Sequence, residues 1–239
     1  MRTSATSARW PRECVRQVLC RTLLFAGLTS SELDSVSQRV SAFGFAPGQV
    51  VFMAGEEAPG IFVVASGAVR SVRQTSSGRE QVLSVEYPYS TVGEVPVLDR
   101  GQCFSTVVAQ CQTELLFISK EDVHHLIGSY PGLLRRTVEV LSGRVREYAE
   151  LVHTLSLREV DRRVAWFLLH EATQRGVVTD AGIAVELTVT HQEIACCVGS
   201  VREMVTRAIG HLQKAGLISL RGRLLVVPSE MDLLSYIST

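Results

Sequence analysis

The sequence contains no apolar run that approaches the roughly 18 residues of a membrane-spanning helix, and neither sign of charge is in excess. Lysine plus arginine and aspartate plus glutamate number 24 each among the 239 residues. The first residues include arginines but no apolar stretch of the kind found in a signal peptide. We therefore expect a cytoplasmic protein without a membrane partner, whose six cysteines stay reduced.

Enzyme motifs are missing as well. The sequence has no glycine-rich phosphate loop, no nucleophile elbow, no HExxH motif and no cysteine pairs at the spacing of a zinc site. We therefore expect the chain not to be an enzyme. Hydrophobic residues make up 46% and charged residues 20%, which is typical of a globular protein with room for one large domain or two small ones.

Short β-rich runs separated by glycines occupy much of the first half of the chain. The runs lie at residues 50–53, 61–64, 68–72, 81–85, 106–109 and 114–118. This pattern predicts an all-β sandwich or barrel. Ahead of it, Thr29 and Glu32 form a capping box that predicts a short helix through Val40, and residues 1–22 are expected to be a weakly ordered arm. A further helix is predicted over residues 120–129.

A long helix is predicted from Pro131, and its apolar residues follow a heptad pattern. Spacings of four and three alternate along it, at Leu134, Val138, Leu141, Val145, Tyr148, Val152 and Leu155. So strict a pattern is typical of a coiled-coil seam, whereas a helix that packs on its own domain usually has a broader apolar stripe. We therefore expect a homodimer formed through this helix, with polar residues such as Arg136, Arg144, Arg146 and Glu150 flanking the seam.

The segment 188–213 has the pattern of a helix-turn-helix. Capping boxes begin at Thr190 and at Ser200, and Gly199 separates the two short helices that they predict. Another capping box, from Ser156 to Glu159, predicts a preceding helix through about residue 174, followed by a glycine-containing loop. Between residues 190 and 223 there are five basic and two acidic residues, which suits contact with a phosphate backbone.

The second of the two short helices carries residue types that read DNA bases. Arg202, Glu203 and Arg207 would project from its first turns into the major groove, where arginine can bond guanine and glutamate can accept from cytosine. The following residues predict a β wing whose Arg221 and Arg223 could contact phosphate. The full set of predicted DNA-binding residues is Thr190, His191, Gln192, Ser200, Arg202, Glu203, Arg207, Arg221 and Arg223.

Motifs in order along the chain resemble the cyclic-AMP receptor protein/fumarate-nitrate regulator (CRP/FNR) family. They are Leu24-Phe-x-Gly-Leu28, Gly48-x-x-Val-Phe52, Gly55-Glu56, Phe62-Val-Val-x-Ser-Gly67, Gly78-Arg-Glu80, Gly93-Glu94, Arg163-Val-Ala165, Gln192-Glu-Ile-Ala, Gly199 and Arg202-Glu203-x-x-x-Arg207. The resemblance implies an α+β fold in three parts: a cyclic-nucleotide-binding-like β-barrel (jelly roll), a long coiled-coil dimerisation helix and a winged helix-turn-helix. The expected domains are the arm 1–22, the sensor barrel 23–130, the dimerisation helix 131–156 and the DNA-binding domain 157–239.

The resemblance also implies a function. A member of this family is expected to be a transcription regulator that binds double-stranded DNA as a dimer, with RNA polymerase as a further partner. Arg202, Glu203 and Arg207 match the cyclic-AMP receptor branch, which reads TGTGA-like half-sites of a palindrome. The alternative is a regulatory module that does not bind DNA and uses the barrel to control an enzyme or a channel, and the same three residues argue against it.

The effector pocket implied by the resemblance lacks one residue. Gly93 and Glu94 match the start of the phosphate-binding turn, but the family's next motif, an Arg-Ser pair that neutralises a cyclic phosphate, is not matched. Phe104-Ser105 stand at its place, or Cys103-Phe104 if the alignment has a one-residue gap, and the arginine is missing either way. Arg100 could substitute only if this loop folded differently. A buried phosphate without a cation is costly, so cyclic AMP is not the expected effector, and the turn could be retained without any ligand. The candidate pocket residues are Gly93, Glu94, Phe104, Ser105 and Tyr148.

The cysteines and histidines leave the cofactor open. Cys14 and Cys20 resemble two cluster ligands of the oxygen-sensing branch, and Cys103 and Cys111 are the weaker candidates to complete the four thiolates of an iron–sulfur cluster. A redox-active thiol is another alternative, and cysteines without either role are the favoured interpretation. Haem would need a ligand such as His124, His125 or His153, and is not favoured. Cys196 and Cys197 are expected to pack in a core.

Overall fold

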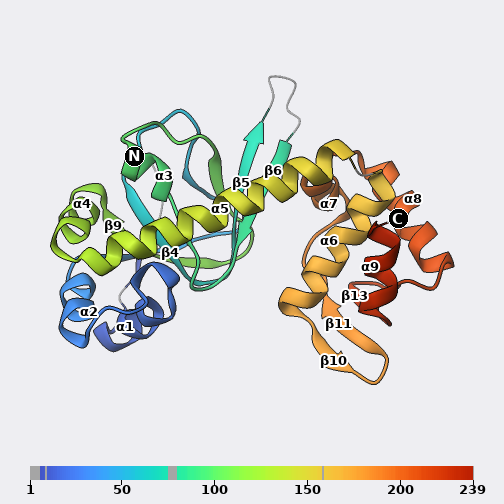
Figure 1. Cartoon of the computed structure of the whole chain (residues 1–239), viewed down its shortest axis with the longest axis horizontal. Coiled ribbons are helices and arrows are strands. Elements are labelled where there is room, and N and C mark those ends of the chain that lie inside the picture. Colours follow the sequence, from blue (N-terminus) through green and yellow to red (C-terminus); the bar gives the residue numbers. More distant parts are fainter. Residues whose placement is uncertain (1–5, 9, 75–79, 158, 239) are drawn as a thin grey trace. The chain divides into compact units, whose positions relative to one another are not determined.

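The computed structural model describes residues 6–8, 10–74, 80–157 and 159–238, with the side chains of all of these except 6–8 and 153–157. The chain forms two compact units (Figure 1). The first comprises Met1–Arg73 and Leu83–Tyr148, and the second comprises Gln74–Val82 and Ala149–Thr239. None of the helices in the described ranges combines the length and apolarity that crossing a membrane requires.

Two antiparallel sheets form the barrel of the first unit. One has the strand order β1-β2-β9-β4-β7 and the other β3-β8-β5-β6. All six runs predicted from the sequence form strands, while β1, β2 and β7 are additional to the prediction. The strands are β1 (Thr6–Ala8), β2 (Val40–Phe45), β3 (Val50–Phe52), β4 (Gly60–Ser66), β5 (Val69–Gln74), β6 (Glu80–Glu86), β7 (Thr91–Val92), β8 (Thr106–Ala109) and β9 (Thr113–Ser119).

Strands β4 and β9 lie at the centre of this core. They pair antiparallel, with Phe62 opposite Phe117, and the ring centroids of these two residues are 4.9 Å apart. Five successive residues of β4, from Gly60 to Val64, are buried, because the helices α3 (Glu94–Asp99) and α4 (Lys120–Ser129) also pack against this strand. A strand covered on both faces reads as a continuous apolar run rather than an alternating one.

The prediction of a weakly ordered N-terminal arm is wrong for residues 12–21. They form the helix α1 (Arg12–Arg21), in which Val15, Val18 and Leu19 are buried in the core of the first unit. The spacing of three and four residues places these side chains on one face of a helix, and burial of that face against the barrel stabilises it. The 3-10 turn η1 (Leu23–Phe25) then leads into the helix α2.

The capping box at Thr29 is confirmed, but the helix that it starts is shorter than predicted. The Thr29 hydroxyl accepts a hydrogen bond from the Glu32 backbone, and the Glu32 carboxylate accepts one from the Thr29 backbone. The helix α2 spans Ser30–Ser37 and does not reach Val40, because Val40 begins β2 and pairs with Ile118.

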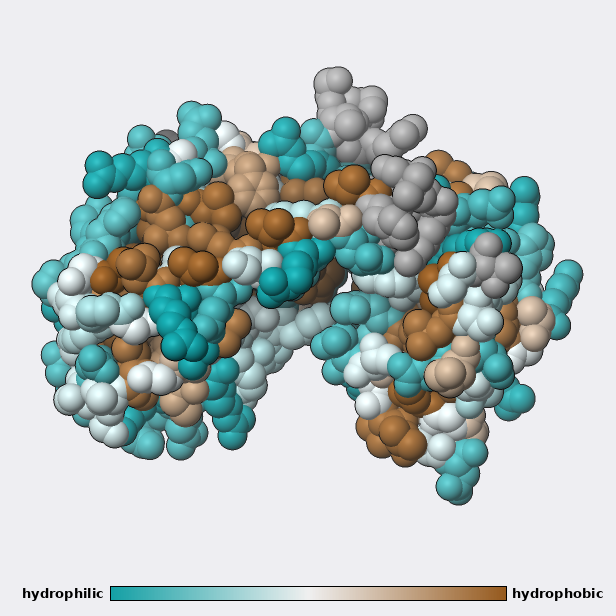
Figure 2. All heavy atoms as spheres, in the orientation of Figure 1, coloured by the Kyte–Doolittle hydropathy of each residue, from teal (hydrophilic) through white to brown (hydrophobic). Residues whose placement is uncertain are grey.

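The predicted long helix is present as α5 (Pro131–Leu157; Figure 1). Its predicted seam is not wholly at the surface of the single chain, because Leu141 and Tyr148 are half-buried and Tyr148 turns toward the barrel. Leu134, Val138, Val145 and Val152 are exposed, with Val145 at 68%, and Figure 2 shows apolar atoms gathered along the course of α5. The side chain of Leu155 lies outside the described residues. The opposite face packs on the barrel through Leu133, Thr137 and Val140.

The capping box predicted from Ser156 is wrong. Ser156 still lies within α5, and the next helix, α6 (Val160–Arg175), begins after Glu159 with no side chain capping its first turn.

The second unit combines four helices with a four-stranded sheet of order β10-β11-β13-β12. Residues 177–186, predicted as part of a glycine-containing loop, form the hairpin β10-β11 instead, because Val185 of β11 is buried and pairs with Leu225 in the core. The elements after α6 are β10 (Val177–Thr179), β11 (Gly182–Glu186), α7 (His191–Val198), α8 (Arg202–Lys214), β12 (Ser219–Arg221), β13 (Leu224–Val227) and α9 (Glu230–Ser238).

Candidate DNA interface and effector pocket

The helix α7 begins at the capping box predicted from the sequence. The Thr190 hydroxyl accepts a hydrogen bond from the Glu193 backbone at 3.2 Å, and the Thr190 backbone donates to the Glu193 carboxylate at 2.7 Å. The helix ends at Gly199, whose φ of 62° is in the left-handed region. Glycine adopts this conformation without a steric cost, so the chain can turn sharply toward α8.

The start of α8 differs from the prediction, because Ser200 does not cap it. The Ser200 backbone N–H still bonds to the Ala195 carbonyl at 2.9 Å and so completes the end of α7. Val201 is therefore the residue before the helix, and no side chain caps the first turn. The uncapped N–H groups of Arg202 and Glu203 lie at the positive end of the helix dipole, where an anion is favoured.

The two faces of α8 differ sharply in character. Val205, Ala208, Ile209 and Leu212 are buried in the core of the second unit. The opposite face carries Arg202, Glu203, Thr206 and Arg207, all exposed. The buried face therefore fixes the rotation of α8, and the exposed face presents the residues predicted to read bases.

Two side-chain contacts hold α7, the turn and α8 together. Arg163 of α6 donates from Nη1 to the carbonyl of Val198 at 2.8 Å and to that of Gly199 at 3.3 Å. His191 Nδ1 lies 2.9 Å from the hydroxyl of Thr206. Arg163 was noticed in the sequence only as part of a motif, because its bond to the turn connects residues that are 35 positions apart.

All nine predicted DNA-binding residues lie on these elements of the second unit. Thr190, His191 and Gln192 are at the start of α7, and Ser200 is in the turn. Arg221 ends β12 and Arg223 precedes β13, in the wing that turns at Gly222. Both wing arginines are exposed, while His191 and Ser200 are half-buried.

The five predicted pocket residues come together in the first unit. Gly93, Glu94, Phe104, Ser105 and Tyr148 line one cavity of about 30 Å³, together with Glu86, Cys103 and Arg144. Its volume is near that of one or two waters and at most about a tenth of the roughly 300–1,000 Å³ in which small molecules bind. Arg100 is exposed at the end of α3 and is not among its lining residues, so it does not supply the missing cation.

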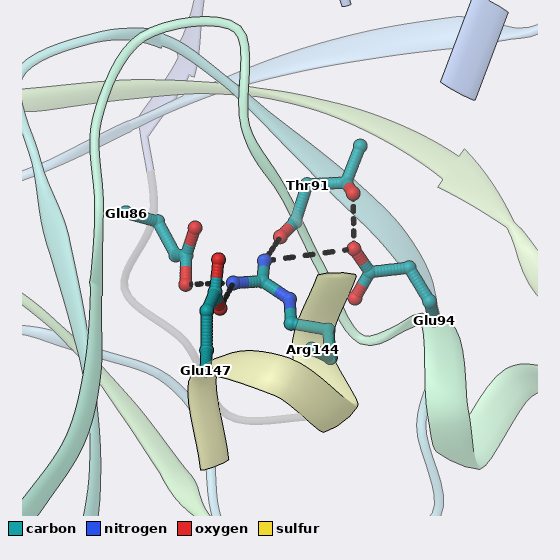
Figure 3. A network of polar contacts seen from close by, with 5 residues as sticks. All are labelled: Glu86, Thr91, Glu94, Arg144 and Glu147. Atoms are coloured by element: carbon teal, nitrogen blue, oxygen red, sulfur yellow. Dashed lines mark hydrogen bonds and ion pairs between the residues drawn. The ribbon is translucent and has the colours of Figure 1, made fainter. Parts of the chain in front are cut away.

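Arg144 is the central residue of this pocket, and sequence reasoning missed it. The sequence predicts Arg144 only as a polar flank of the seam. Its side chain is 14% exposed and points at the barrel (Figure 3). Its guanidinium bonds the Glu86 carboxylate at 2.5 Å, the Thr91 carbonyl at 2.7 Å and the Glu147 carboxylate at 3.1 Å. It also lies 3.8 Å from Glu94, which accepts a hydrogen bond from the Thr91 hydroxyl.

Helical spacing contained a signal for this position. Arg144 follows Thr137 by seven residues and precedes Tyr148 by four, so all three lie on one face of α5. Thr137 is buried, and Tyr148 lines the pocket with its ring 6.2 Å from that of Phe104. A second face with this periodicity could have been separated from the seam, although its carboxylate partners could not.

The charges in the pocket are unbalanced, since two carboxylates share one deeply placed guanidinium. Burial raises the pKa of Glu86, and the neighbouring Arg144 only partly opposes this. Burial lowers the pKa of Arg144, but the carboxylates of Glu86 and Glu94 outweigh it and hold this pKa above its ordinary value. Burial also raises the pKa of Tyr148. An additional anion such as a cyclic phosphate is therefore disfavoured here.

We expect Glu86→Gln to change how stability depends on pH. Because its folded pKa is raised above the unfolded value of about 4.3, the folded state holds the proton more tightly, so the carboxyl stabilises at low pH. That contribution is lost as pH rises through the folded pKa, by about 1.4 kcal/mol per unit of pKa shift. Denaturant unfolding at a series of pH values should therefore show wild type losing stability relative to the variant as pH increases.

Glu139→Gln on α5 is the control, because the pKa of Glu139 is shifted in the direction opposite to that of Glu86. Hydrogen bonds from Arg136 and Arg135 lower the pKa of Glu139, so wild type should gain stability relative to this variant as pH rises. If both variants shifted in the same direction, the burial of Glu86 would not be the cause of its effect.

The four cysteines considered as cluster ligands do not form a site. Cys14 and Cys20 lie on α1, Cys111 is exposed, and Cys103 is 2% exposed in the pocket. Across the described ranges, no three histidine, cysteine or acidic side chains are grouped as metal ligands would be. Burial raises the pKa of Cys103, and the Glu56 carboxylate adds to this, so its thiol stays protonated and poorly reactive at neutral pH.

The histidines considered as haem ligands lie on two helices. His124 and His125 lie on α4, and the His153 side chain, on α5, lies outside the described residues.

Comparisons with known proteins agree with this arrangement. A cyclic nucleotide-binding domain model matches residues 43–130, and a Crp-like helix-turn-helix domain model matches residues 162–236. The Cyclic AMP receptor protein of Thermus thermophilus is 31% identical over 197 residues, which cover 82% of this chain and 88% of that relative. This chain belongs to the CRP/FNR family of transcription regulators.

Two further proteins match most of the chain. The CRP-like cAMP-activated global transcriptional regulator of Mycobacterium tuberculosis is 26% identical over 211 residues, covering 88% of this chain and 94% of that protein. FixK2 from Bradyrhizobium japonicum has the same fold, with a TM-score of 0.74 at 22% identity, covering 82% of this chain and 96% of that one. The predicted family and fold class are confirmed, and a module without a DNA-binding part is not supported.

Proposed function

We propose that this CRP/FNR regulator binds an inverted repeat in double-stranded DNA as a homodimer, and that its sensor responds to something other than cyclic AMP. The exposed face of α8 supports the DNA-binding part most directly. Arginine can bond guanine bidentately and glutamate can accept from cytosine, and Arg202, Glu203 and Arg207 present these groups on a helix whose other face is buried.

Contacts to phosphate complete the proposed interface. Thr190, His191 and Gln192 stand at the start of α7 and Ser200 lies in the turn before α8, where helix N-termini favour phosphate. Arg221 and Arg223 of the wing supply exposed positive charges. Phosphate contacts position a protein on DNA without reading its sequence, so specificity rests on the three residues of α8.

The apolar stripe of α5 supports the homodimer. Leu134, Val138, Val145 and Val152 are exposed in the single chain at the spacing of a coiled-coil seam. A second copy related by two-fold symmetry would cover each residue with its own counterpart and present two copies of α8. Action on RNA polymerase stays a prediction that follows from the proposed role in transcription.

The chemistry of the pocket argues against cyclic AMP. By the resemblance to the family, Phe104 or Cys103 takes the place of the arginine that would neutralise the phosphate. The two buried carboxylates, Glu86 and Glu94, already exceed the charge of Arg144. The small volume of the cavity points the same way. The names of the Thermus and Mycobacterium relatives refer to cyclic AMP, and we propose that this chain differs from them in its signal.

Selection of binding sites from random DNA tests the function. The purified full-length protein should select an inverted repeat with half-site centres about one helical turn apart. Affinity for the selected site should fall steeply as salt increases, because phosphate contacts release counterions. Enrichment of no sequence, or of a site without two-fold symmetry, would contradict the proposal.

A further inference from the structure

The sensor pocket is filled by side chains from α5. Arg144 and Tyr148 both reach into it, and the cavity that they leave is about 30 Å³. The Tyr148 ring meets the exposed edge of the pocket at Phe104, with the two rings nearly perpendicular at 87°. An effector of ordinary size could enter only by displacing these side chains.

The Arg144 guanidinium joins three parts of the barrel to the helix. Glu86 is the last residue of β6, Thr91 begins β7, and Glu94 is the first residue of α3. Figure 3 shows these groups on different sides of one planar guanidinium. A bound effector would hold a barrel and a helix together in the same way, through polar contacts to both.

The Arg144 guanidinium also supplies the positive charge that faces the two buried carboxylates of the pocket. Glu86 and Glu94 are 4% and 5% exposed, and without a cation both carboxylates would be buried with no opposite charge near them. Burying charges without a partner is strongly unfavourable. What remains after removal of the Arg144 side chain is therefore an acidic site, with a backbone carbonyl, that fits a small planar cation with several N–H donors.

We propose that Arg144 serves as an internal ligand of the sensor, so that this regulator binds DNA without a small-molecule effector. The inference rests on the proposed DNA-binding function. The pocket and the DNA-binding part are connected along the chain by α5, which continues from Arg144 to Leu157 and so enters the second unit. In this proposal, the contacts that fix α5 on the barrel take the place of a bound effector in permitting DNA binding.

Chemical complementation of Arg144→Ala tests this. Wild type is unfolded, dialysed free of small molecules and refolded, and it should bind its selected DNA at full strength. Arg144→Ala should bind on the order of a hundredfold more weakly. Methylguanidinium should restore this binding and raise the melting temperature of Arg144→Ala. At a methylguanidinium concentration ten times its Kd, the ratio of folded to unfolded protein should increase roughly tenfold. Sodium chloride and methylammonium chloride at equal ionic strength serve as controls for salt and for charge alone.

Arg136→Ala is the matched control variant. Arg136 is also on α5 and is also partly buried, but it bonds the Ala26 carbonyl and Glu139 instead of the pocket. Methylguanidinium should have no effect on this variant or on wild type. Cyclic AMP should neither stabilise nor activate wild type, Arg136→Ala or Arg144→Ala.

The possible outcomes separate this inference from the proposed function. If refolded wild type needed a small-molecule extract to bind DNA, or if methylguanidinium failed to stabilise Arg144→Ala, the internal ligand would be ruled out. Should Arg144→Ala not fold, Arg144→Met retains the packing volume and should lose DNA binding without rescue, and full binding by that variant would overturn the inference. Rescue of the melting temperature in a protein whose wild type binds no DNA would support the internal ligand and refute the DNA-binding function.

Discussion

Arg202→Ala is expected to weaken binding to the selected palindrome by about 1–3 kcal/mol per half-site and to relax the preference at one base pair. Arg202 is the first residue of α8 and is exposed, so its side chain can reach a base edge without moving the core. A bidentate bond to guanine is lost in the variant, and the other bases are then tolerated at that position. Binding-site selection with the variant protein measures this directly.

Arg223→Ala is the matched control for base reading. Arg223 is exposed next to Gly222 in the wing, where a contact to phosphate is expected. Its loss should weaken all DNA sequences alike and reduce the slope of log affinity against log salt by about one unit. If Arg202→Ala left the base preference unchanged while Arg223→Ala altered it, the roles that we assign to α8 and the wing would be reversed.

Val145→Glu is expected to convert the dimer into monomers that bind the palindrome poorly. Val145 is 68% exposed in the single chain and lies in the middle of the predicted seam. A glutamate there would be buried against the same residue of the second copy, and two unpaired buried carboxylates oppose association strongly. Light scattering at micromolar concentration measures the mass, and a titration with the full palindrome measures the binding.

Arg146→Glu introduces the same residue one position along the helix. Arg146 is exposed and lies outside the heptad positions, so this variant should remain a dimer. A monomeric wild type, or a dimeric Val145→Glu, would show that the α5 seam is not the interface.

Much of this architecture could be predicted because it depends on short stretches of sequence. The capping boxes at Thr29 and Thr190 act within four residues, and the turn at Gly199 needs only the backbone freedom of one residue. The seam of α5 repeats every seven residues, so its period distinguishes it from a strand. Interactions of this range are visible in a linear sequence, although two further capping boxes that the sequence predicts, at Ser156 and Ser200, do not form.

Other features were decided by packing between distant segments. Val15, Val18 and Leu19 form a helix because the barrel offers them a core, and Ser200 does not cap α8 because its backbone completes α7. The pocket is the clearest case. Arg144 pairs with Glu86 from 58 residues away and with Thr91 from 53, and no local pattern relates these positions.

The sequence alone determined that Arg144 stands on α5, and that Glu86 and Glu94 stand at the end of β6 and just after β7. Whether that arginine would be a solvated flank of the seam or the cation of a buried site depended on which face of α5 meets the barrel. Tertiary structure decided this, because the burial of Leu133, Thr137 and Val140 fixes the rotation of the helix. With the rotation fixed, Arg144 has to point inward, and the desolvated carboxylates that it meets there require its charge.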